Sequence, residues 1–203
     1  MTTYSKVIIL LHGFNSAPGR KYEQIKSYLT DCNLNDKCEL IAPKLNVNPK
    51  SAIQEINNLI ITNKDKTVFL IGTSLGGFYA NYFRAKFQGN FLYVHSINPS
   101  WTPSKSLRKY KNKELSNFKT HEAYLFKDSY LTQLEKFENF ITSHLESPSK
   151  EHYSIHLSQS DEVLKFEIML EFLNKKQIKF QKKEYESDHR FDKIKEVIKL
   201  LLL

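Results

Sequence analysis

A glycine-flanked serine stands in the first half of the chain, in the segment Gly72-Thr73-Ser74-Leu75-Gly76. The apolar run 67–71 directly before it predicts a β-strand, and the amphipathic run 75–87 after it predicts a helix. A serine on so sharp a strand-to-helix turn has a strained backbone and needs residues without a Cβ two positions before and after it. The pattern therefore predicts that Ser74 is a nucleophile and that Gly72 and Gly76 make room for its turn.

The alternative for a glycine-rich turn of this kind is a phosphate site at the N-terminus of the following helix. The sequence has neither the G-x-G-x-x-G spacing nor the lysine of a phosphate-binding loop around Ser74. The nucleophile interpretation is therefore the favoured one.

A serine hydroxyl is a weak nucleophile at neutral pH, so it needs a histidine base and a carboxylate that orients the base. In the chain order serine, acid, histidine, the candidates are Asp161 and His189, each in a polar segment after a predicted strand. Asp188 and Glu162 are adjacent alternatives for the acid. The other histidines are attributed to the core, to the surface or to loop structure: His12, His95, His121, His144, His152 and His156.

An acyl-transfer site also needs backbone N–H groups that face the negative charge growing on the carbonyl oxygen. The amide of Leu75, directly after the serine, is one expected donor, and the amide of Phe14, after the first predicted strand, is the other. Trp101, Tyr124 and Val163 are candidate acyl-pocket residues together with Phe14, although ordinary core packing explains each of them equally well.

Five segments of the chain carry a resemblance to a known family: 11–16, 72–80, 97–99, 160–164 and 187–191. Their residues, order and spacing are similar to those of the YqiA-like bacterial esterases (UPF0227), a compact branch of the α/β-hydrolases. The resemblance implies the acid role for Asp161, the base role for His189, and activity on short acyl esters and acyl-CoA thioesters. Ser160 and Ser187 stand where that family commonly has glycine.

Short apolar runs that alternate with helical stretches predict an α/β fold, a three-layer α/β/α sandwich with a mostly parallel sheet of about six strands. The predicted strands are 6–11, 38–42, 67–71, 91–97, 153–157 and 178–185, and the predicted helices are 20–29, 51–61, 75–87, 130–145, 165–175 and 191–203. Ser51 is the predicted N-cap of the second helix.

The polar, lysine-rich segment 101–148 interrupts this alternation of strands and helices. It follows the fourth predicted strand, so it is expected to lie over the carboxyl ends of the sheet, where ligands bind in open α/β folds. The length of the chain suits one domain, so we predict a single domain, 1–203, with 101–148 as a cap insertion.

The net charge of +8 is the balance of 26 Lys and only 4 Arg, spread along the chain, against 22 Asp and Glu. Nucleic-acid recognition favours arginine and interleaved aromatic residues, so a lysine-rich surface is the expected explanation and no nucleic-acid partner is predicted. Cys32 and Cys38 lack the further ligands of a metal site, so two free thiols, no metal and no cofactor are expected. No apolar run has the length of a signal or membrane segment, which favours a cytoplasmic protein.

These observations predict a serine esterase or thioesterase that acts on a small-molecule acyl ester or acyl-CoA through an acyl-enzyme. The alternative is a non-catalytic scaffold of the same fold that binds an anionic partner. A monomer and a homodimer are both compatible with the sequence.

Overall fold

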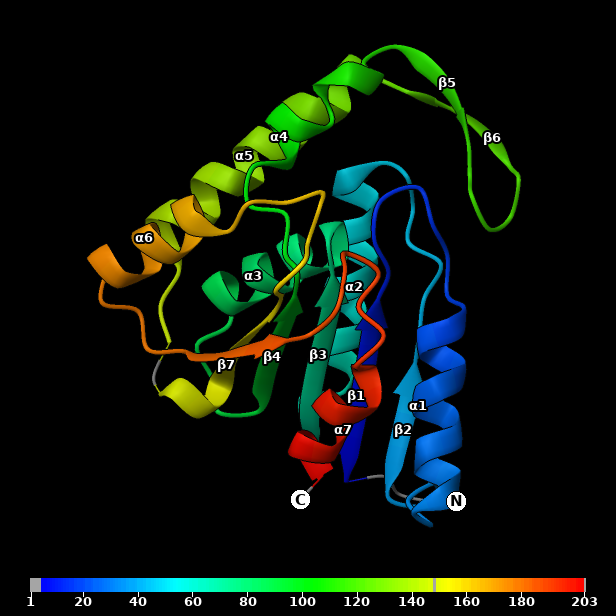
Figure 1. The fold of residues 1–203 in the computed structure, drawn as a ribbon, viewed down its shortest axis with the longest axis vertical. Helices are drawn as coiled ribbons and strands as arrows, with labels where there is room; N and C mark the ends of the chain where they lie inside the picture. The colour runs from blue at the N-terminus through cyan, green and yellow to red at the C-terminus, as the bar shows by residue number, and fades with distance from the viewer. Residues whose placement is uncertain (1–4, 148, 203) are drawn as a thin grey trace.

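A six-stranded sheet, parallel throughout, forms the centre of the computed structural model, which describes residues 5–147 and 149–202 (Figure 1). Its strand order is β2-β1-β3-β4-β7-β8. The strands are β1 (Lys6–Leu11), β2 (Cys38–Ile41), β3 (Thr67–Thr73), β4 (Leu92–Ile97), β7 (Tyr153–Ser158) and β8 (Gln181–Tyr185). Because all six run the same way, the loops after them meet at one edge of the sheet. The sheet and its flanking helices confirm the predicted fold class.

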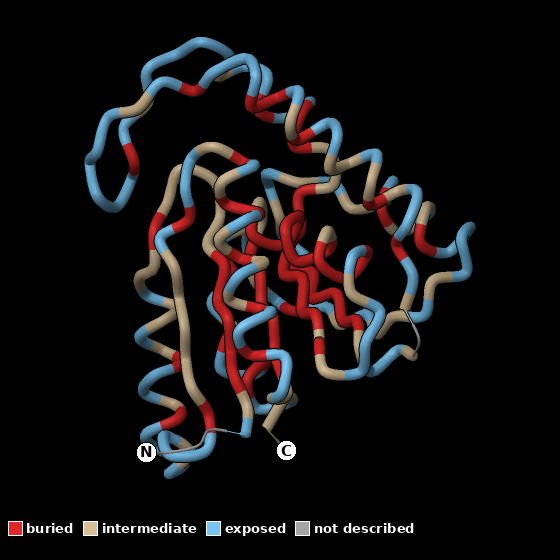
Figure 2. Tube along the Cα trace, turned by 180° about the vertical axis from the view of Figure 1, so that it is seen from behind, coloured by how far each residue is buried: buried red, intermediate tan, exposed pale blue. Residues whose placement is uncertain are grey.

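Helices cover both faces of the sheet, as the continuous apolar strands predict. One buried cluster joins α1 (Arg20–Asp31) and α7 (Ile194–Leu202) to Ile8 and Leu10 of β1. The other joins α2 (Pro49–Thr62), α3 (Leu75–Lys86) and α5 (Asp128–His144) to Val7 and Ile9, the alternate residues of the same strand. The central strands are accordingly the most deeply buried part of the chain (Figure 2).

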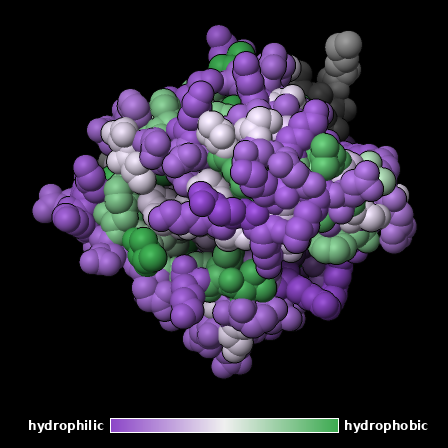
Figure 3. Space-filling view, turned by 90° about the horizontal axis from the view of Figure 1, so that it is seen from above, coloured by the Kyte–Doolittle hydropathy of each residue, from purple (hydrophilic) through white to green (hydrophobic). Residues whose placement is uncertain are grey.

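The segment between β4 and β7 forms a layer across the carboxyl ends of the strands (Figure 1). It contains α4 (Pro103–Ser106), a 3-10 turn (Arg108–Tyr110), an antiparallel hairpin of β5 (Lys113–Ser116) and β6 (Ala123–Phe126), and α5. Seen from this end, the surface is mostly hydrophilic with separate apolar patches (Figure 3). The sequence predicted the helix but not the hairpin, because β5 is short and mostly exposed and lacks an apolar alternation.

Several element boundaries differ from the predicted ones. The second helix begins at Pro49, and its cap is Asn48, whose Oδ1 accepts a hydrogen bond from Lys50 N at 3.0 Å, so the predicted cap at Ser51 is wrong. Proline suits the first helical position, where its missing N–H costs nothing. The last helix begins at Ile194, because Phe191 has a φ of 52°, which a helix does not allow. Its predicted end at Leu203 lies outside the described residues.

Both cysteines are free, Cys32 on the surface and Cys38 in the core, where burial raises the pKa of the thiol to about 11. Among residues 5–147 and 149–202, no helix combines the length and the apolar character that crossing a membrane requires.

A chain of three buried polar side chains crosses β4, β7 and β8 beneath the loops. His95 Nδ1 lies 3.1 Å from His156 Nε2, and His156 Nδ1 lies 2.9 Å from the hydroxyl of Tyr185. Burial, and secondly the charge of Lys183, lowers the pKa of His95 to about 3. Burial, followed by His95 and Lys183, holds the pKa of His156 well below its ordinary value. Both imidazoles are therefore neutral at neutral pH.

This histidine pair predicts a loss of stability on mild acidification. Because both folded-state pKa values are lowered, the unfolded chain takes up protons below about pH 6.5 and the folded chain does not. The free energy of unfolding should therefore fall between pH 7 and 5, approaching a slope of about 1.4 kcal/mol per pH unit for each histidine. Urea unfolding followed by Trp101 fluorescence measures this slope.

The variant His156→Gln should have a shallower slope over the same pH range. The matched control is His121→Asn, because His121 is exposed at a φ of 59°, a conformation that asparagine tolerates. It should retain the wild-type slope. A wild-type stability that is flat from pH 7 to 5 contradicts the prediction.

Candidate active site

Ser74 occupies the turn between β3 and α3 with an unusual backbone conformation, φ 56° and ψ −115°. Side chains with a Cβ seldom adopt a positive φ, so the surroundings must hold the residue in place. Its N–H donates to Ile97 O at 2.9 Å, and its carbonyl accepts from Phe78 N at 3.0 Å and from Ser100 N at 3.1 Å. The serine is thus tied to the end of β4 and to the first turn of α3.

Two glycines make this turn sterically possible. A Cβ on Gly72 would lie 2.1 Å from the carbonyl oxygen of Gly76, and a Cβ on Gly76 would lie 2.5 Å from that of Leu11. Both distances are far below van der Waals contact, so the chain can pass through this turn only with glycine at each position. The close approach also brings α3 against the end of β1, where Gly13 faces the Cβ of Ser74.

Asp161 and His189 lie in the loops after β7 and β8, and their side chains meet. His189 Nδ1 is 2.7 Å from Asp161 Oδ2, with the carboxylate only 1% exposed and the imidazole 20% exposed. The other oxygen, Oδ1, accepts from the amides of Val163 and Leu164, both at 2.8 Å. The carboxylate is therefore fixed by backbone amides on one side and orients the imidazole on the other.

The two alternative acids have other partners. Glu162 accepts a hydrogen bond from the backbone N of His189 at 3.2 Å, and Asp188 accepts one from Arg190 N at 2.9 Å. Neither carboxylate meets the ring of His189 within the described part of the chain. Neither Ser74 Oγ nor His189 Nε2 forms a hydrogen bond among the described residues, and such contacts are often long until substrate binds.

Asn98 connects the strand end beside Ser74 to the loop that carries His189. It is fully buried directly after β4, with a φ of 42°. Its Oδ1 accepts from Ser158 N at 2.8 Å, and its Nδ2 donates to Ser158 Oγ at 2.8 Å. The same Nδ2 lies 3.4 Å from the carbonyl oxygens of Asp188 and His189. One side chain therefore connects the ends of β4 and β7 with the loop that carries His189.

Phe14 and Leu75, the predicted oxyanion-hole residues, line one small cavity of about 40 Å³ beside the serine. Leu75 begins α3, so its amide has no partner within the helix and is free to donate. The ring of Phe14 packs on Tyr110 and Phe126, with centroids 5.2 Å and 5.5 Å away. The cavity lies on the sheet face covered by α2, α3 and α5, because Pro49, Tyr79 and Leu134 line it too.

The β5–β6 hairpin is bonded to the loop that contains Phe14. Asn15 Nδ2 donates to Ser116 O at 3.0 Å, and Tyr124 Oη donates to Asn15 Oδ1 at 2.9 Å. Asn117 Nδ2 donates to Ser16 O at 2.9 Å, while its Oδ1 accepts from two amides of its own turn. Sequence reasoning missed this contact, because nothing in the local pattern around Asn117 points to a residue 101 positions away.

Of the three further candidate pocket residues, Tyr124 lines the cavity and the other two do not. Trp101 packs on Phe172 with ring centroids 5.2 Å apart, and Val163 is 60% exposed. His12 uses both ring nitrogens, Nδ1 toward Gly13 O at 2.9 Å and Nε2 as acceptor from Leu45 N at 3.0 Å. Burial lowers its pKa, which keeps the ring neutral as a brace between two loops.

Asn98 was missed as a positioning residue, although the segment 97–99 that carries it was among those resembling the family.

As for metals, the described residues contain no group of three or more His, Cys, Asp and Glu side chains that could hold an ion.

Solved structures with the same fold are α/β-hydrolases. A structure reported for the metagenome-derived lipolytic enzymes LipS and LipT matches with a TM-score of 0.70 at 14% identity, over 98% of this chain and 92% of that one. Est1E from Butyrivibrio proteoclasticus matches with a TM-score of 0.67 at 15% identity, over 98% and 85%. S-formylglutathione hydrolase from Staphylococcus aureus matches with 0.65 at 14%, over 98% and 82%. The fold and the serine turn thus define the chain as an α/β-hydrolase-fold protein.

A family model narrows this class. The model described as "Uncharacterised protein family (UPF0227)" matches residues 7–202, nearly the whole chain. The protein therefore belongs to the UPF0227 family, which confirms the resemblance found in its motifs.

Because the side-chain amide of Asn98 is buried, replacing Asn98 should lower the free energy of unfolding more than replacing a similar surface asparagine. Asn98→Gly preserves the positive φ but removes the partner of Ser158 N, and a buried polar group left without a partner costs about 1–3 kcal/mol. Asn112→Gly is the matched control, since Asn112 is exposed at a φ of 55° and its side chain accepts a hydrogen bond from Asp128 N at 3.0 Å. Urea unfolding should show a loss of at least about 2 kcal/mol for the first variant and under about 1 kcal/mol for the second. Equal losses of stability in the two variants contradict the connecting role of Asn98.

Proposed function

We propose that the protein is a serine hydrolase that cleaves short acyl esters through a triad of Ser74, Asp161 and His189. The observation that carries the proposal is the 2.7 Å contact between His189 Nδ1 and the buried carboxylate of Asp161, in the loops that flank the strained serine turn. A histidine held in this way is oriented to act as a base toward a hydroxyl.

In the proposed reaction, Ser74 Oγ attacks the acyl carbonyl while His189 Nε2 takes the hydroxyl proton. Asp161 stabilises the resulting imidazolium, and the amides of Phe14 and Leu75 bind the oxyanion. His189 then returns the proton to the leaving alcohol as the tetrahedral intermediate collapses to an acyl-enzyme. Water, deprotonated by His189, attacks this ester and releases the carboxylic acid and Ser74.

Thioesters are cleaved by the same steps, so acyl-CoA thioesters belong to the proposed substrate class. Cationic side chains near the histidine loop support an anionic leaving group. Lys21 Nζ donates a hydrogen bond to the carbonyl oxygen of Arg190. Burial lowers the pKa of Lys21 most, and the nearby charges of Arg20 and Lys119 lower it further. Asp188 and Asp192 oppose part of this charge.

A fluorophosphonate probe tests the nucleophile directly. Wild-type protein should be labelled, and Ser74→Ala should not, whereas Ser106→Ala, at an exposed serine of the insertion, should be labelled like the wild type. His189→Ala and Asp161→Asn should lower kcat on short esters and thioesters by roughly 10⁴-fold, provided that circular dichroism shows them folded. Absent labelling leaves the non-catalytic scaffold as the better interpretation, and labelling that persists in Ser74→Ala contradicts Ser74 as the nucleophile.

The hairpin contact predicts that Asn117 positions the amide of Phe14. Asn117→Ala should lower kcat about tenfold or more with little change in KM, because a displaced oxyanion donor weakens the transition state more than the ground state. Affinity for a trifluoromethyl ketone, which mimics the oxyanion, should fall in parallel. The control Asn139→Ala, at an exposed position of α5, should change neither. A change in KM alone contradicts the positioning role.

A further inference from the structure

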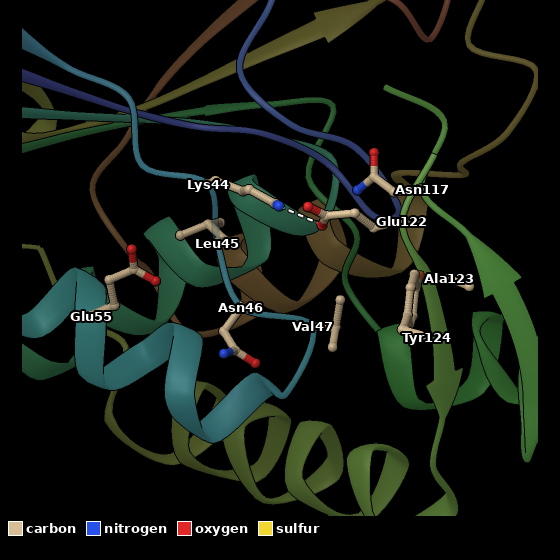
Figure 4. A pocket seen from close by; sticks show the side chains of 9 residues that line it. All are labelled: Lys44, Leu45, Asn46, Val47, Glu55, Asn117, Glu122, Ala123 and Tyr124. Atoms are coloured by element: carbon tan, nitrogen blue, oxygen red, sulfur yellow. Dashed lines mark hydrogen bonds and ion pairs between the residues drawn. The ribbon is translucent and has the colours of Figure 1, made fainter. Parts of the chain in front are cut away.

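A groove of about 470 Å³ lies between the loop after β2 and the β5–β6 hairpin (Figure 4). Figure 4 shows Lys44 reaching from the loop side to Glu122 on the hairpin side, where the two form an ion pair. The residues that line the groove are Lys44, Leu45, Asn46, Val47, Glu55, Asn117, Glu122, Ala123 and Tyr124. Neither the groove nor the cavity beside the serine includes Ser74, Asp161 or His189 among its lining residues.

The groove continues the small cavity beside Phe14 and Leu75. Five residues line both spaces: Leu45, Asn46, Val47, Asn117 and Tyr124. The cavity measures about 40 Å³, and one water molecule needs about 10–15 Å³ of such volume, so it has room for about three heavy atoms. A longer group that enters the cavity must continue between these shared residues, Tyr124 among them, into the groove.

The position of His189 indicates which half of an ester faces this space. Its loop lies on the sheet face of α1 and α7, where Lys21 of α1 bonds Arg190 O and Phe191 joins the α1–α7 cluster. The general acid must lie next to the leaving oxygen, so the leaving group departs on that face. The cavity lies on the opposite face, against α2, α3 and α5, and is therefore on the acyl side.

The two spaces differ in chemistry. Most side chains that line the cavity are apolar, among them Leu75, Leu107 and Leu134. The polar side chains of Asn15, Asn46 and Asn117 line it too. The groove is mixed, with two carboxylates against one ammonium, and Lys44 is already paired with Glu122. Glu55 is half-buried in α2, and its carboxylate has no hydrogen bond or ion pair among the described residues, so this carboxylate is available to a donor on the ligand.

We infer that the cavity and the groove form one acyl channel, in which Tyr124 determines how far the acyl chain extends and Glu55 selects a hydrogen-bond donor at its far end. The substrate class is an acyl ester with a few apolar carbons next to the carbonyl and an ammonium or hydroxyl group beyond them. This inference rests on the proposed hydrolase function.

A series of 4-nitrophenyl esters with one leaving group tests the channel: acetyl, butanoyl, hexanoyl, 6-aminohexanoyl and the adipate half ester. Each kcat/KM is divided by that of the acetyl ester, so that any general change in the catalytic groups cancels. Among the three six-carbon esters, the amino ester should exceed the unsubstituted one by about threefold to fivefold, which is the value of one partly exposed ion pair. The adipate half ester should be the poorest of the three.

Variants separate the two roles. Glu55→Gln should abolish the preference for the amino ester, and Glu23→Gln, which makes the same charge change in α1 outside both spaces, should retain it. Tyr124→Ala should raise the hexanoyl-to-acetyl ratio of kcat/KM about tenfold, because it removes the ring that limits the length of the acyl chain. Tyr124→Phe keeps the ring and loses only the hydrogen bond to Asn15, so its ratio should remain that of the wild type.

Each outcome bears on one conclusion. Ester cleavage that depends on Ser74 but ignores chain length, the distal charge and both channel variants overturns the channel and leaves the proposed function standing. Equal ratios in Tyr124→Ala and the wild type overturn the role of Tyr124. Failure to cleave any ester of the series overturns the proposed function and the channel with it.

Discussion

The strained backbone of Ser74 is the constraint on which the arrangement of the site depends. A positive φ on a serine exposes its hydroxyl at the tip of a turn, and the turn exists only because Gly72 and Gly76 leave no Cβ in the way. The same close contacts bring α3 against the end of β1. The loop that carries the proposed oxyanion amide of Phe14 therefore lies beside Ser74 as a consequence of the turn itself.

The site is joined together from below by buried hydrogen bonds. Asn98 links β4, β7 and the loop that carries His189. Asp161 accepts hydrogen bonds from two backbone amides through one oxygen and contacts His189 through the other. The bonds between Asn98 and Ser158 are shielded from water, so breaking one leaves a buried partner unsatisfied and costs more than a surface contact would. Such a frame can hold a base in place without help from the substrate.

The segment between β4 and β7 adds contacts on the side of the site that faces away from the sheet. Its hairpin contributes Asn117 and Tyr124, which bond the loop that contains Phe14, and it also forms one wall of the groove. Hydrogen bonds between Asn15, Ser116 and Tyr124 fasten this hairpin to the loop. One short element therefore connects the proposed catalytic geometry with the proposed choice of acyl group.

The sequence by itself determined the sheet, the serine turn and the identity of the candidate acid and base, because these depend on local patterns and on chain order. Apolar runs mark strands wherever both faces are covered, and glycines two residues either side of a serine mark a turn that few sequences allow. The hairpin and the contacts of Asn98 and Asn117 were decided only by the tertiary structure. Asn98 bonds Ser158, 60 positions away, and Asn117 bonds Ser16, 101 positions away. Most partners of these two side chains are backbone groups, which every residue carries and which no sequence pattern distinguishes.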